Sequence, residues 1–549
     1  MDSFKKMFIL VFSNIIKRKM VICYAVLLLK LVITFPMPLI QQYIIDNILI
    51  IGKSRSLPFL SIAILLIGIL QILINIFYNI SYNKLIQLTL FNLRNQTLKK
   101  IFNIPLEKME GFNSSYILNR IFADSDQLVG FILGILFNAL QDIAIFLIGV
   151  AILFSLSPKI SYVILFLVPF SFLLYQIFKK KIYSSSLDLK EATNKLYSKT
   201  NESLNKIDLI KKNSWKIKEI NKFYENFQFY WEQYLKYIKT FSFFTSISSS
   251  VTFLSSIIVL IMGIYEISNS KLTIGGLVAI NLSMQYIINP IYHFSTISGN
   301  YQESAASLFR MQEILEIVEE KNGRLVLNEI NTIRLNEVQF GFNDRVLINK
   351  FSFKFKKNNI YAITGKSGGG KTTLANLLLR VYPVEKDTIF FNDIDINDFE
   401  ISSLHSRIMI VEQEPRLFND TIYNNVTYNL NSINAEKINK MFEELTIMRF
   451  VDRLPNTLHT VVNENGNNIS GGEKQRIALF RVILNEPDVI IMDEPTSAID
   501  SITVTDIIEL LSVLKKDKIL IIITHSNELI SSADYVINID NDFSSEPSL

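Results

Sequence analysis

The chain of 549 residues has room for several domains, and its composition indicates that apolar and charged segments are separated along it. Hydrophobic residues make up 49% of the sequence and 40 residues are phenylalanine, yet 19% are charged. The net charge of +4 gives no support for a nucleic-acid partner. The single cysteine, Cys23, excludes a disulfide scaffold and a cysteine metal site.

Six apolar runs are long enough to cross a bilayer as helices, which takes about 20 residues. The first continues well past the length of a signal core and shows no convincing cleavage site, so we interpret it as a membrane helix. Basic residues concentrate after the second run and between the fourth and fifth, so both termini are expected in the cytoplasm of a cell-membrane protein. The six runs are Met20 to Leu39, Leu57 to Ile80, Leu128 to Leu156, Ile160 to Phe178, Phe241 to Tyr265 and Ile274 to Phe294.

The two basic loops are long and have the pattern of helices. Asn83 to Ile104 carries apolar residues at helical spacing, and Lys190 to Tyr237 is mixed charged and amphipathic. We therefore expect long helices that project into the cytoplasm, with turns near Glu110–Tyr116 and Asp208–Lys218.

A charged stretch around Gly323 separates two halves of different character. We expect residues 1–318 to form an all-α six-helix transmembrane domain and residues 319–549 to form a soluble α/β domain. Several strands of the second half are continuous apolar runs, typical of strands buried on both faces of a mostly parallel sheet. The expected strands are Thr332 to Phe340, Ile360 to Thr364, Ile408 to Val411, Val489 to Met492 and Ile519 to Thr524.

A glycine-rich turn between a strand and a helix carries the pattern G-x-x-x-x-G-K-T. Phosphates can approach backbone N–H groups only where no Cβ intrudes, and the helix N-terminus adds positive potential. Lys371 is expected to reach the β- and γ-phosphates, and the Thr372 hydroxyl suits Mg²⁺. The predicted ATP-binding residues here are Gly365, Lys366, Ser367, Gly368, Gly369, Gly370, Lys371, Thr372 and Thr373.

Polar residues follow three further strands. Asp493 suits Mg²⁺ through water, and Glu494 suits a general base that orients water at the γ-phosphate. The alternative for this pair is a turn before Pro495. His525 and Gln413 also follow strands and are expected at the same carboxyl edge of the sheet.

A second anion-binding turn is predicted at Ser470, Gly471 and Gly472, which begin a helix. These residues alone do not indicate which anion they bind.

The order and spacing of these motifs resemble the nucleotide-binding domain of the ATP-binding cassette (ABC) superfamily. Its signature is usually Leu-Ser-Gly-Gly-Gln, so Ile469 and Glu473 depart from it at the outer positions. Phe342 stands where the family places an adenine-stacking Tyr, and Glu464 resembles the acidic loop of family exporters. The first half resembles an exporter-type transmembrane domain, on Pro38 to Asp46, Leu118 to Arg120 with Asp124, Leu272 to Gly275, Pro290 and Gln302 to Arg310.

The resemblance implies a half-transporter whose ATP sites form between two chains, so a homodimer or a heterodimer is expected. Each ATP would lie between the phosphate loop of one subunit and Ser470, Gly471 and Gly472 of the other. Implied Mg²⁺ ligands are Thr372, Gln413 and Asp493; implied catalytic residues are Lys371, Glu494 and His525.

The implied function is export of an amphipathic substrate, such as a peptide, bacteriocin or drug, driven by ATP hydrolysis. The alternatives are a lipid flippase, or an importing, non-exporting or regulatory ATPase of the same fold. Because only Met1 to Lys19 precede the first span, no N-terminal peptidase domain is expected.

Two ionisable residues within the spans are candidates for substrate contact. Lys30 lies in the first span, and Asp142 lies in the third, near Asn138 and Gln141. They are expected either to line the pathway or to pair with each other. For Lys30, the alternative is extension to the membrane surface, or a water-filled cavity without substrate contact.

Overall fold

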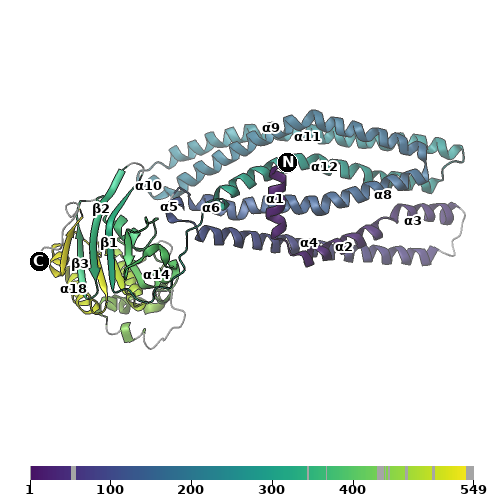
Figure 1. Ribbon diagram of the computed structural model, residues 1–549. Coiled ribbons are helices and arrows are strands. Elements are labelled where there is room, and N and C mark those ends of the chain that lie inside the picture. Colours follow the sequence, from purple (N-terminus) through teal and green to yellow (C-terminus); the bar gives the residue numbers. More distant parts are fainter. Residues whose placement is uncertain are drawn as a thin grey trace. The chain divides into compact units, whose positions relative to one another are not determined.

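Helices make up the first of two compact units in the computed structural model (Figure 1). This unit comprises Met1–Phe102 with Phe112–Glu316, and the second comprises Asn103–Gly111 with Ile317–Leu549. The structure describes residues 2–50, 57–109, 111–342, 345–366, 368–428, 438, 440–442, 445–463, 466, 468–496 and 501–539.

The first unit contains six long helical segments, several of which are built from consecutive helices. After α1 (Asp2–Ser13), the first segment is α2 (Lys17–Thr34), α3 (Met37–Ile44) and the π-helical η1 (Ile45–Ile50), and the second is α4 (Leu57–Phe102). The third is α6 (Ser114–Asn119), π-helical η3 (Arg120–Asp124), α7 (Ser125–Leu133), π-helical η4 (Gly134–Ala139) and α8 (Leu140–Leu156). The others are α9 (Pro158–Asn205), α11 (Lys216–Ser268) and α12 (Ile274–Leu315), with the short α10 (Ile207–Lys212) between α9 and α11.

Four stretches of these helices are long and apolar enough to cross a membrane: Lys17–Ile48, Pro58–Phe102, Ser114–Leu156 and Lys216–Ser268. They agree with the first, second, third and fifth predicted spans. The fourth and sixth fall on α9 and α12, where some side chains lie outside the described residues. Pro169 and Pro290 lie inside these two helices without ending them.

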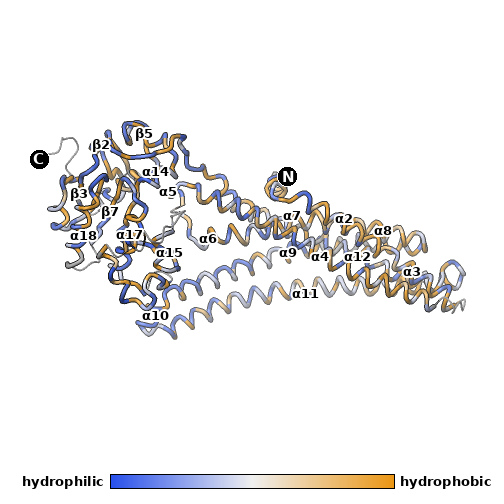
Figure 2. The backbone as a smooth tube through the Cα atoms, turned by 90° about the horizontal axis from the view of Figure 1, so that it is seen from below, coloured by the Kyte–Doolittle hydropathy of each residue, from blue (hydrophilic) through white to orange (hydrophobic). Residues whose placement is uncertain are grey.

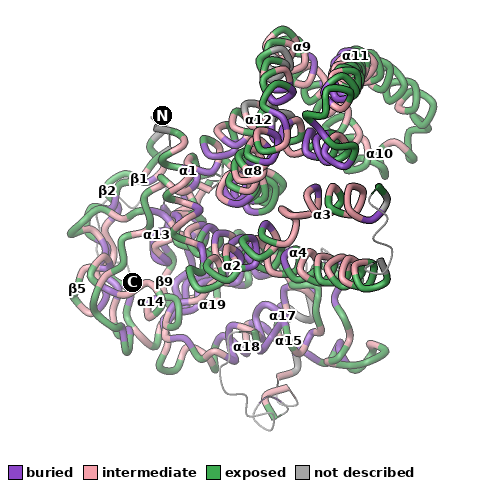
Figure 3. The backbone as a smooth tube through the Cα atoms, turned by 90° about the vertical axis from the view of Figure 1, so that its right-hand side faces the viewer, coloured by how far each residue is buried: buried purple, intermediate pink, exposed green. Residues whose placement is uncertain are grey.

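The surface of the helical unit changes character along its length. Figure 2 shows α9 and α11 mostly hydrophilic toward α10 and more hydrophobic toward their other ends. Large apolar side chains such as Phe59 and Leu65 of α4 are exposed, as expected for helices that face lipid. Figure 3 shows that much of α9 and α11 is exposed.

Two segments that are far apart in sequence meet at the start of α12. The Asp46 carboxylate accepts hydrogen bonds from the Thr273 hydroxyl at 2.6 Å and from the Gly275 N–H at 2.9 Å. A Cβ on Gly275 would lie 2.5 Å from the Gln42 carbonyl oxygen, so only glycine fits here.

The second unit contains a five-stranded parallel sheet in the order β6-β7-β8-β3-β9. Residues on successive positions of β7 enter different apolar clusters: Val489 and Ile491 lie on one face, and Ile490 and Met492 on the other. The predicted burial of both faces is therefore confirmed. The strands are β3 (Asn359–Thr364), β6 (Ile408–Val411), β7 (Val489–Asp493), β8 (Ile519–Ile523) and β9 (Tyr535–Asn538).

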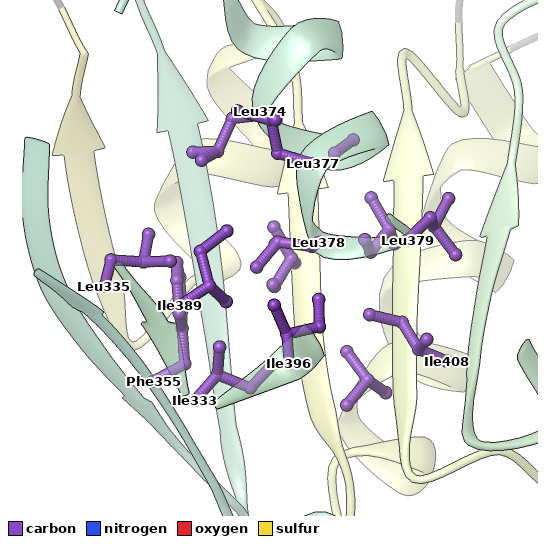
Figure 4. Close-up of a cluster of buried hydrophobic side chains, with 14 of the residues drawn as sticks. Ile333, Leu335, Phe355, Leu374, Leu377, Leu378, Leu379, Ile389, Ile396 and Ile408 are labelled. Carbon is purple, nitrogen blue, oxygen red and sulfur yellow. The ribbon is translucent and has the colours of Figure 1, made fainter. Parts of the chain in front are cut away.

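A second sheet is antiparallel and has the order β2-β1-β4-β5. Only its strand β1 was predicted, as Thr332 to Phe340. It contains β1 (Thr332–Phe342), β2 (Arg345–Lys356), β4 (Ile389–Phe391) and β5 (Ile394–Asp395). The β2 sequence alternates lysines with apolar residues because only one face is buried. Apolar residues of this sheet and leucines of α13 (Lys371–Leu378) form one core cluster (Figure 4).

The remaining helices cover the sheets or connect strands. Asp387 and Asp393 have positive φ angles of 62° and 68°, and Asn358, directly before β3, has a φ of 66°. Asn and Asp adopt this conformation more readily than other non-glycine residues. These helices are α5 (Leu106–Met109), η5 (Ile396–Asp398), α14 (Ile401–Arg407), α15 (Ile422–Thr427), η6 (Thr446–Arg453), η7 (Thr457–His459), α17 (Gly471–Leu484), α18 (Ser501–Leu514) and α19 (Asn527–Ser532).

Candidate functional site

The candidate site begins at the turn from β3 to α13. Gly368 and Gly370 have φ angles of +75° and +89°, in the region that favours glycine. A Cβ on Gly370 would lie 3.0 Å from Ile348 Cγ1 and 3.2 Å from the Leu347 carbonyl oxygen. The backbone conformation therefore fixes the shape of the turn. As a result, the N–H groups at the start of α13 converge at one place.

The Lys371 ammonium lies inside this turn. Its Nζ donates to the carbonyl oxygens of Gly365 at 2.7 Å and Lys366 at 3.0 Å, and the side chain is largely buried. The Gly369 N–H donates to the same Lys366 carbonyl at 3.0 Å. A buried cation beside glycine N–H groups makes this turn a site for a polyanion.

Thr372, in the first turn of α13, meets Asp493, at the end of β7. The Thr372 hydroxyl donates to Asp493 Oδ2 at 2.6 Å, and Asp493 is buried at the end of β7. A hydroxyl and a carboxylate are the hard oxygen donors that Mg²⁺ prefers, so these residues fit that ion.

Glu494 and His525 complete the edge of the sheet. Glu494 has a φ of +46°, an unusual conformation for a non-glycine residue, and its N–H donates to the Ile523 carbonyl at 2.8 Å. His525 Nε2 lies 3.8 Å from Glu494 Oε1 and 3.3 Å from Lys371 Nζ. The backbone therefore turns Glu494 out of the strand at the edge where the cation and the imidazole meet.

Gln475 is a site residue that sequence analysis missed. Its Nε2 donates to the carbonyl oxygens of Gln413 and Glu494, at 3.3 Å each, and the residue is 2% exposed. It ties α17 to the ends of β6 and β7. A polar residue on the buried face of the predicted helix was the available signal.

The second predicted anion-binding turn starts α17. Ser470 is the N-cap of this helix. Its hydroxyl and its N–H both donate to Glu473 Oε2, at 2.8 and 2.7 Å respectively. Glu473 N–H donates back to the Ser470 oxygen at 3.3 Å, which completes a capping box. Gly471 and Gly472 form the first turn of the helix. The departure from the family's glutamine thus places a carboxylate on the Ser470 hydroxyl.

Several predicted residues have no described side-chain contact at the site. Thr373 lies in the first turn of α13 and Phe342 at the end of β1, where only its backbone is described. Ser367 and Glu464 lie outside the described residues.

The two ionisable residues of the predicted spans do not contact each other. The Lys30 ammonium lies over the Tyr78 ring, 4.7 Å from its centroid. The Asp142 carboxylate contacts His293 Nδ1, at 3.0 Å from Oδ2 and 3.2 Å from Oδ1. The prediction that they pair is wrong, because each finds a nearer partner on another helix.

Two family models match the chain, in the order of the two units. The ABC transporter transmembrane region matches residues 20–291, and a model described as ABC transporter matches residues 348–497.

Curated relatives have similar organisation along most of the chain. A putative export ATP-binding/permease protein of Rickettsia typhi is 27% identical over 90% of this chain and 86% of its own length. An ATP-dependent lipid A-core flippase of Idiomarina loihiensis is 31% identical over 60% of this chain and 56% of its own length. The lactococcin-G-processing and transport ATP-binding protein of Lactococcus lactis is 26% identical over 91% and 72%.

Among solved structures, a bacterial Atm1-family ABC exporter with ATP bound is similar with a TM-score of 0.80. The match covers 95% of this chain and 94% of that one at 21% identity, so the likeness concerns the fold.

Proposed function

Because the chain belongs to the ABC transporter family, with an exporter-type transmembrane region ahead of an ATPase cassette, we propose that it is a half-transporter exporting an amphipathic cargo as a dimer. One observation carries this proposal. The cation of Lys371, the Thr372–Asp493 pair and the Glu494–His525 pair converge at one edge of the parallel sheet. That edge offers a phosphate cradle, a Mg²⁺ position and a base in one place.

Each residue of the site has a proposed part in ATP hydrolysis. Thr372, Gln413 and Asp493 would hold Mg²⁺, which would neutralise charge on the phosphates. Lys371 and the N–H groups of the turn bind the β- and γ-phosphates, and Phe342 stacks on the adenine. Glu494 orients the attacking water, with His525 beside it.

The second subunit supplies the other wall of each ATP site. We place Ser470, Gly471 and Gly472 of one subunit on the γ-phosphate held by Lys371 of the other. The hydrolytic residues are present in this chain, which permits a homodimer and equally a heterodimer with a related half-transporter. We also propose that the chain lies in the inner membrane with both termini in the cytoplasm, because the positions of its basic loops favour that orientation.

Removal of the base tests the hydrolytic assignment. We expect Glu494→Gln, in the full chain reconstituted in lipid nanodiscs, to bind ATP normally and to lose ATPase activity by at least about 100-fold. The matched control is Glu486→Gln, an exposed carboxylate at the opposite end of β7, which retains turnover. Undiminished ATPase in Glu494→Gln contradicts the assignment.

Two-tag purification of mixed dimers tests the shared site. A dimer with Lys371→Ala in one subunit and Ser470→Ala in the other has one intact ATP site under the proposal. A dimer with both changes in the same subunit has none. We therefore expect higher ATPase activity from the first arrangement, and equal activities contradict a shared site.

A lipid flippase is the second candidate, since the lipid A-core flippase of Idiomarina loihiensis is similar to this chain. Proteoliposomes separate the two functions. ATP-dependent accumulation of a labelled amphipathic peptide inside inverted vesicles supports peptide export. ATP-dependent movement of a labelled lipid between leaflets, without peptide accumulation, supports the flippase.

A further inference from the structure

A polar pocket of about 450 Å³ lies in the helical unit, outside the nucleotide site. Residues of α7, η4 and α8, in the third predicted span, form one wall, and α12 forms the other. Its polar lining residues are Asn138, Gln141, Asp142, His293 and Asn300.

The backbone of the third span opens this pocket. Its wall includes the π-helical turn η4, a feature that appears frequently at functional sites in longer helices. Gly130 and Gly134 also line it. A Cβ on Gly130 would meet no atom within 4 Å, and one on Gly134 would meet only Asn138 Nδ2, at 3.9 Å. The space beside these glycines is therefore free of protein.

Asp142 gives the pocket its charge. The residue is 7% exposed, and its carboxylate is held by His293 Nδ1 from the facing helix. With the neutral imidazole protonated on Nδ1, His293 donates a hydrogen bond and leaves the negative charge in place. Among the lining residues, all within the described part of the chain, none is lysine or arginine.

The remaining polar groups fit a donor-rich cation. The amide oxygens of Asn138, Gln141 and Asn300 are acceptors that can share the N–H groups of an ammonium with the Asp142 carboxylate. A phosphate would meet an unneutralised carboxylate instead, which disfavours a phospholipid headgroup. Phe131, Ile135 and Ile297 supply apolar wall for the adjoining part of the ligand.

The other uses of such a cluster fit less well. A metal site needs more ligands than one carboxylate and one imidazole, and no group of three or more His, Cys, Asp or Glu suited to a metal occurs among the described residues. Ionisable residues in membrane helices face the bundle interior or a water-filled cavity, since lipid solvates them poorly. Asp142 agrees with this rule, because it is buried and lines the pocket between helices.

We propose that this pocket binds the basic group of the cargo, the ammonium or guanidinium of an amphipathic peptide, with Asp142 as its counter-ion and His293 as the residue that positions the carboxylate. The proposal rests on the proposed function, because it names the cargo class of that exporter. The pocket has room for one charged side chain of the cargo and the apolar group next to it. Recognition therefore depends on a local basic group within a longer amphipathic cargo.

The probe is a matched pair of fluorescent amphipathic 12-residue peptides. One carries a single lysine and the other carries Nε-acetyl-lysine at that position. Their affinities for the full chain in phosphatidylcholine nanodiscs are measured by anisotropy. We expect the lysine peptide to bind about tenfold more tightly, from the attraction between two unit charges in contact in a partly desolvated pocket.

Three variants show whether Asp142 is the cause. Asp142→Asn removes the charge at nearly constant shape and abolishes the difference between the peptides. Gly130→Leu fills the pocket and weakens the lysine peptide selectively, which guards against a folding defect in the first variant. Glu266→Gln is the matched control, because Glu266 is also a buried carboxylate of the helical unit, paired with Lys159 at 3.3 Å outside the pocket; it retains the tenfold preference.

The outcomes separate this pocket from the proposed function. Equal binding of the two peptides by the wild type, or an undiminished preference in Asp142→Asn, overturns the proposed role of the pocket. In either case, ATPase activity and its loss in Glu494→Gln still support the proposed transporter. Absence of ATPase activity in the wild type overturns the proposed function instead. Preferential binding of a phosphate-bearing lipid at this pocket, displaced by neither peptide, also overturns the proposal.

Discussion

The phosphate turn and the membrane pocket are built in opposite ways. In the turn, residues adjacent in sequence are placed by backbone geometry, which holds Lys371 Nζ against the carbonyl oxygens of Gly365 and Lys366. At the pocket, the essential pair is Asp142 and His293, which come from different helices and are 151 positions apart. The first arrangement can be recognised in sequence as a motif, whereas the second exists only after helices pack.

The same contrast extends through the helical unit. Asp46 meets Thr273 across 227 positions, and Asp124 meets Arg310 across 186. Each pair joins an early helix to α12, so α12 is fixed by polar contacts from three separate places. The phosphate turn of the cassette depends on local conformation, whereas its contacts with Asp493 and His525 span 121 and 154 positions. The architecture of the helical unit depends on long-range pairs throughout.

The largest effect, on ATPase activity, is expected in the phosphate turn, where local backbone geometry positions the Lys371 ammonium. Lys371→Ala removes the cation from the phosphate turn, so ATPase activity should fall by at least about 100-fold, as when a donor to developing negative charge is removed. Steady-state hydrolysis in nanodiscs measures the loss. Lys386→Ala is the control, because Lys386 is an exposed lysine of the same unit that lies outside the phosphate turn. Equal loss in both variants contradicts a special role for the Lys371 ammonium.

The long-range pairs should instead affect stability. Asp124 is buried against Arg120, at 2.7 Å, and Arg310, whose Nε lies 3.2 Å from Oδ2. Asp124→Ala leaves both guanidinium groups uncompensated and should cost about 3 kcal/mol, the lower end for a broken buried pair because Arg310 is 35% exposed. Thermal unfolding of the purified chain measures this loss.

A neighbouring carboxylate provides the control for that change. Asp126 pairs with Arg94 at 2.7 Å but is 54% exposed, so Asp126→Ala should cost less than about 1 kcal/mol. Similar melting shifts for the two variants contradict the view that burial of the Asp124 network fixes α12.

These differences explain what the sequence predicts and what it does not. Strands β3, β6, β7 and β8 were predicted nearly residue for residue because burial on both faces gives continuous apolar runs. Of the antiparallel sheet, only β1 was predicted; β2 was missed because lysines interrupt it on its exposed face. The phosphate turn was predicted from its glycines, but Gln475 was not, since its hydrogen bonds to two backbone carbonyls depend on how α17 packs.

A smaller effect, on stability, distinguishes the cost of backbone strain from the cost of new side-chain contacts within the phosphate turn. Gly370→Ala forces a side chain into the left-handed region, at about 1–2 kcal/mol, and adds contacts with Ile348 and Leu347. Gly368→Ala has the same conformational strain at φ +75°, but its Cβ meets no atom within 4 Å. We therefore expect a lower unfolding midpoint for Gly370→Ala than for Gly368→Ala, measured by differential scanning fluorimetry. The reverse order of the two midpoints contradicts a destabilising contribution from the contacts with Ile348 and Leu347.

The smallest effect concerns two cassette carboxylates whose pKa values move in opposite directions. Burial raises the pKa of Glu320, so the folded chain binds its proton more tightly than the unfolded chain and stability falls as pH rises above the ordinary glutamate pKa. Glu320→Gln should therefore raise the unfolding midpoint at neutral pH, by an amount equivalent to no more than about 0.5 kcal/mol, and lose this advantage on acidification.

A hydrogen bond from Lys357 lowers the pKa of Glu329. Glu329→Gln should therefore lower the unfolding midpoint at neutral pH and have no effect on it in acid. Melting curves of both variants from about pH 4 to 8 distinguish the two signs, and parallel behaviour contradicts the assignment of burial to one carboxylate and pairing to the other.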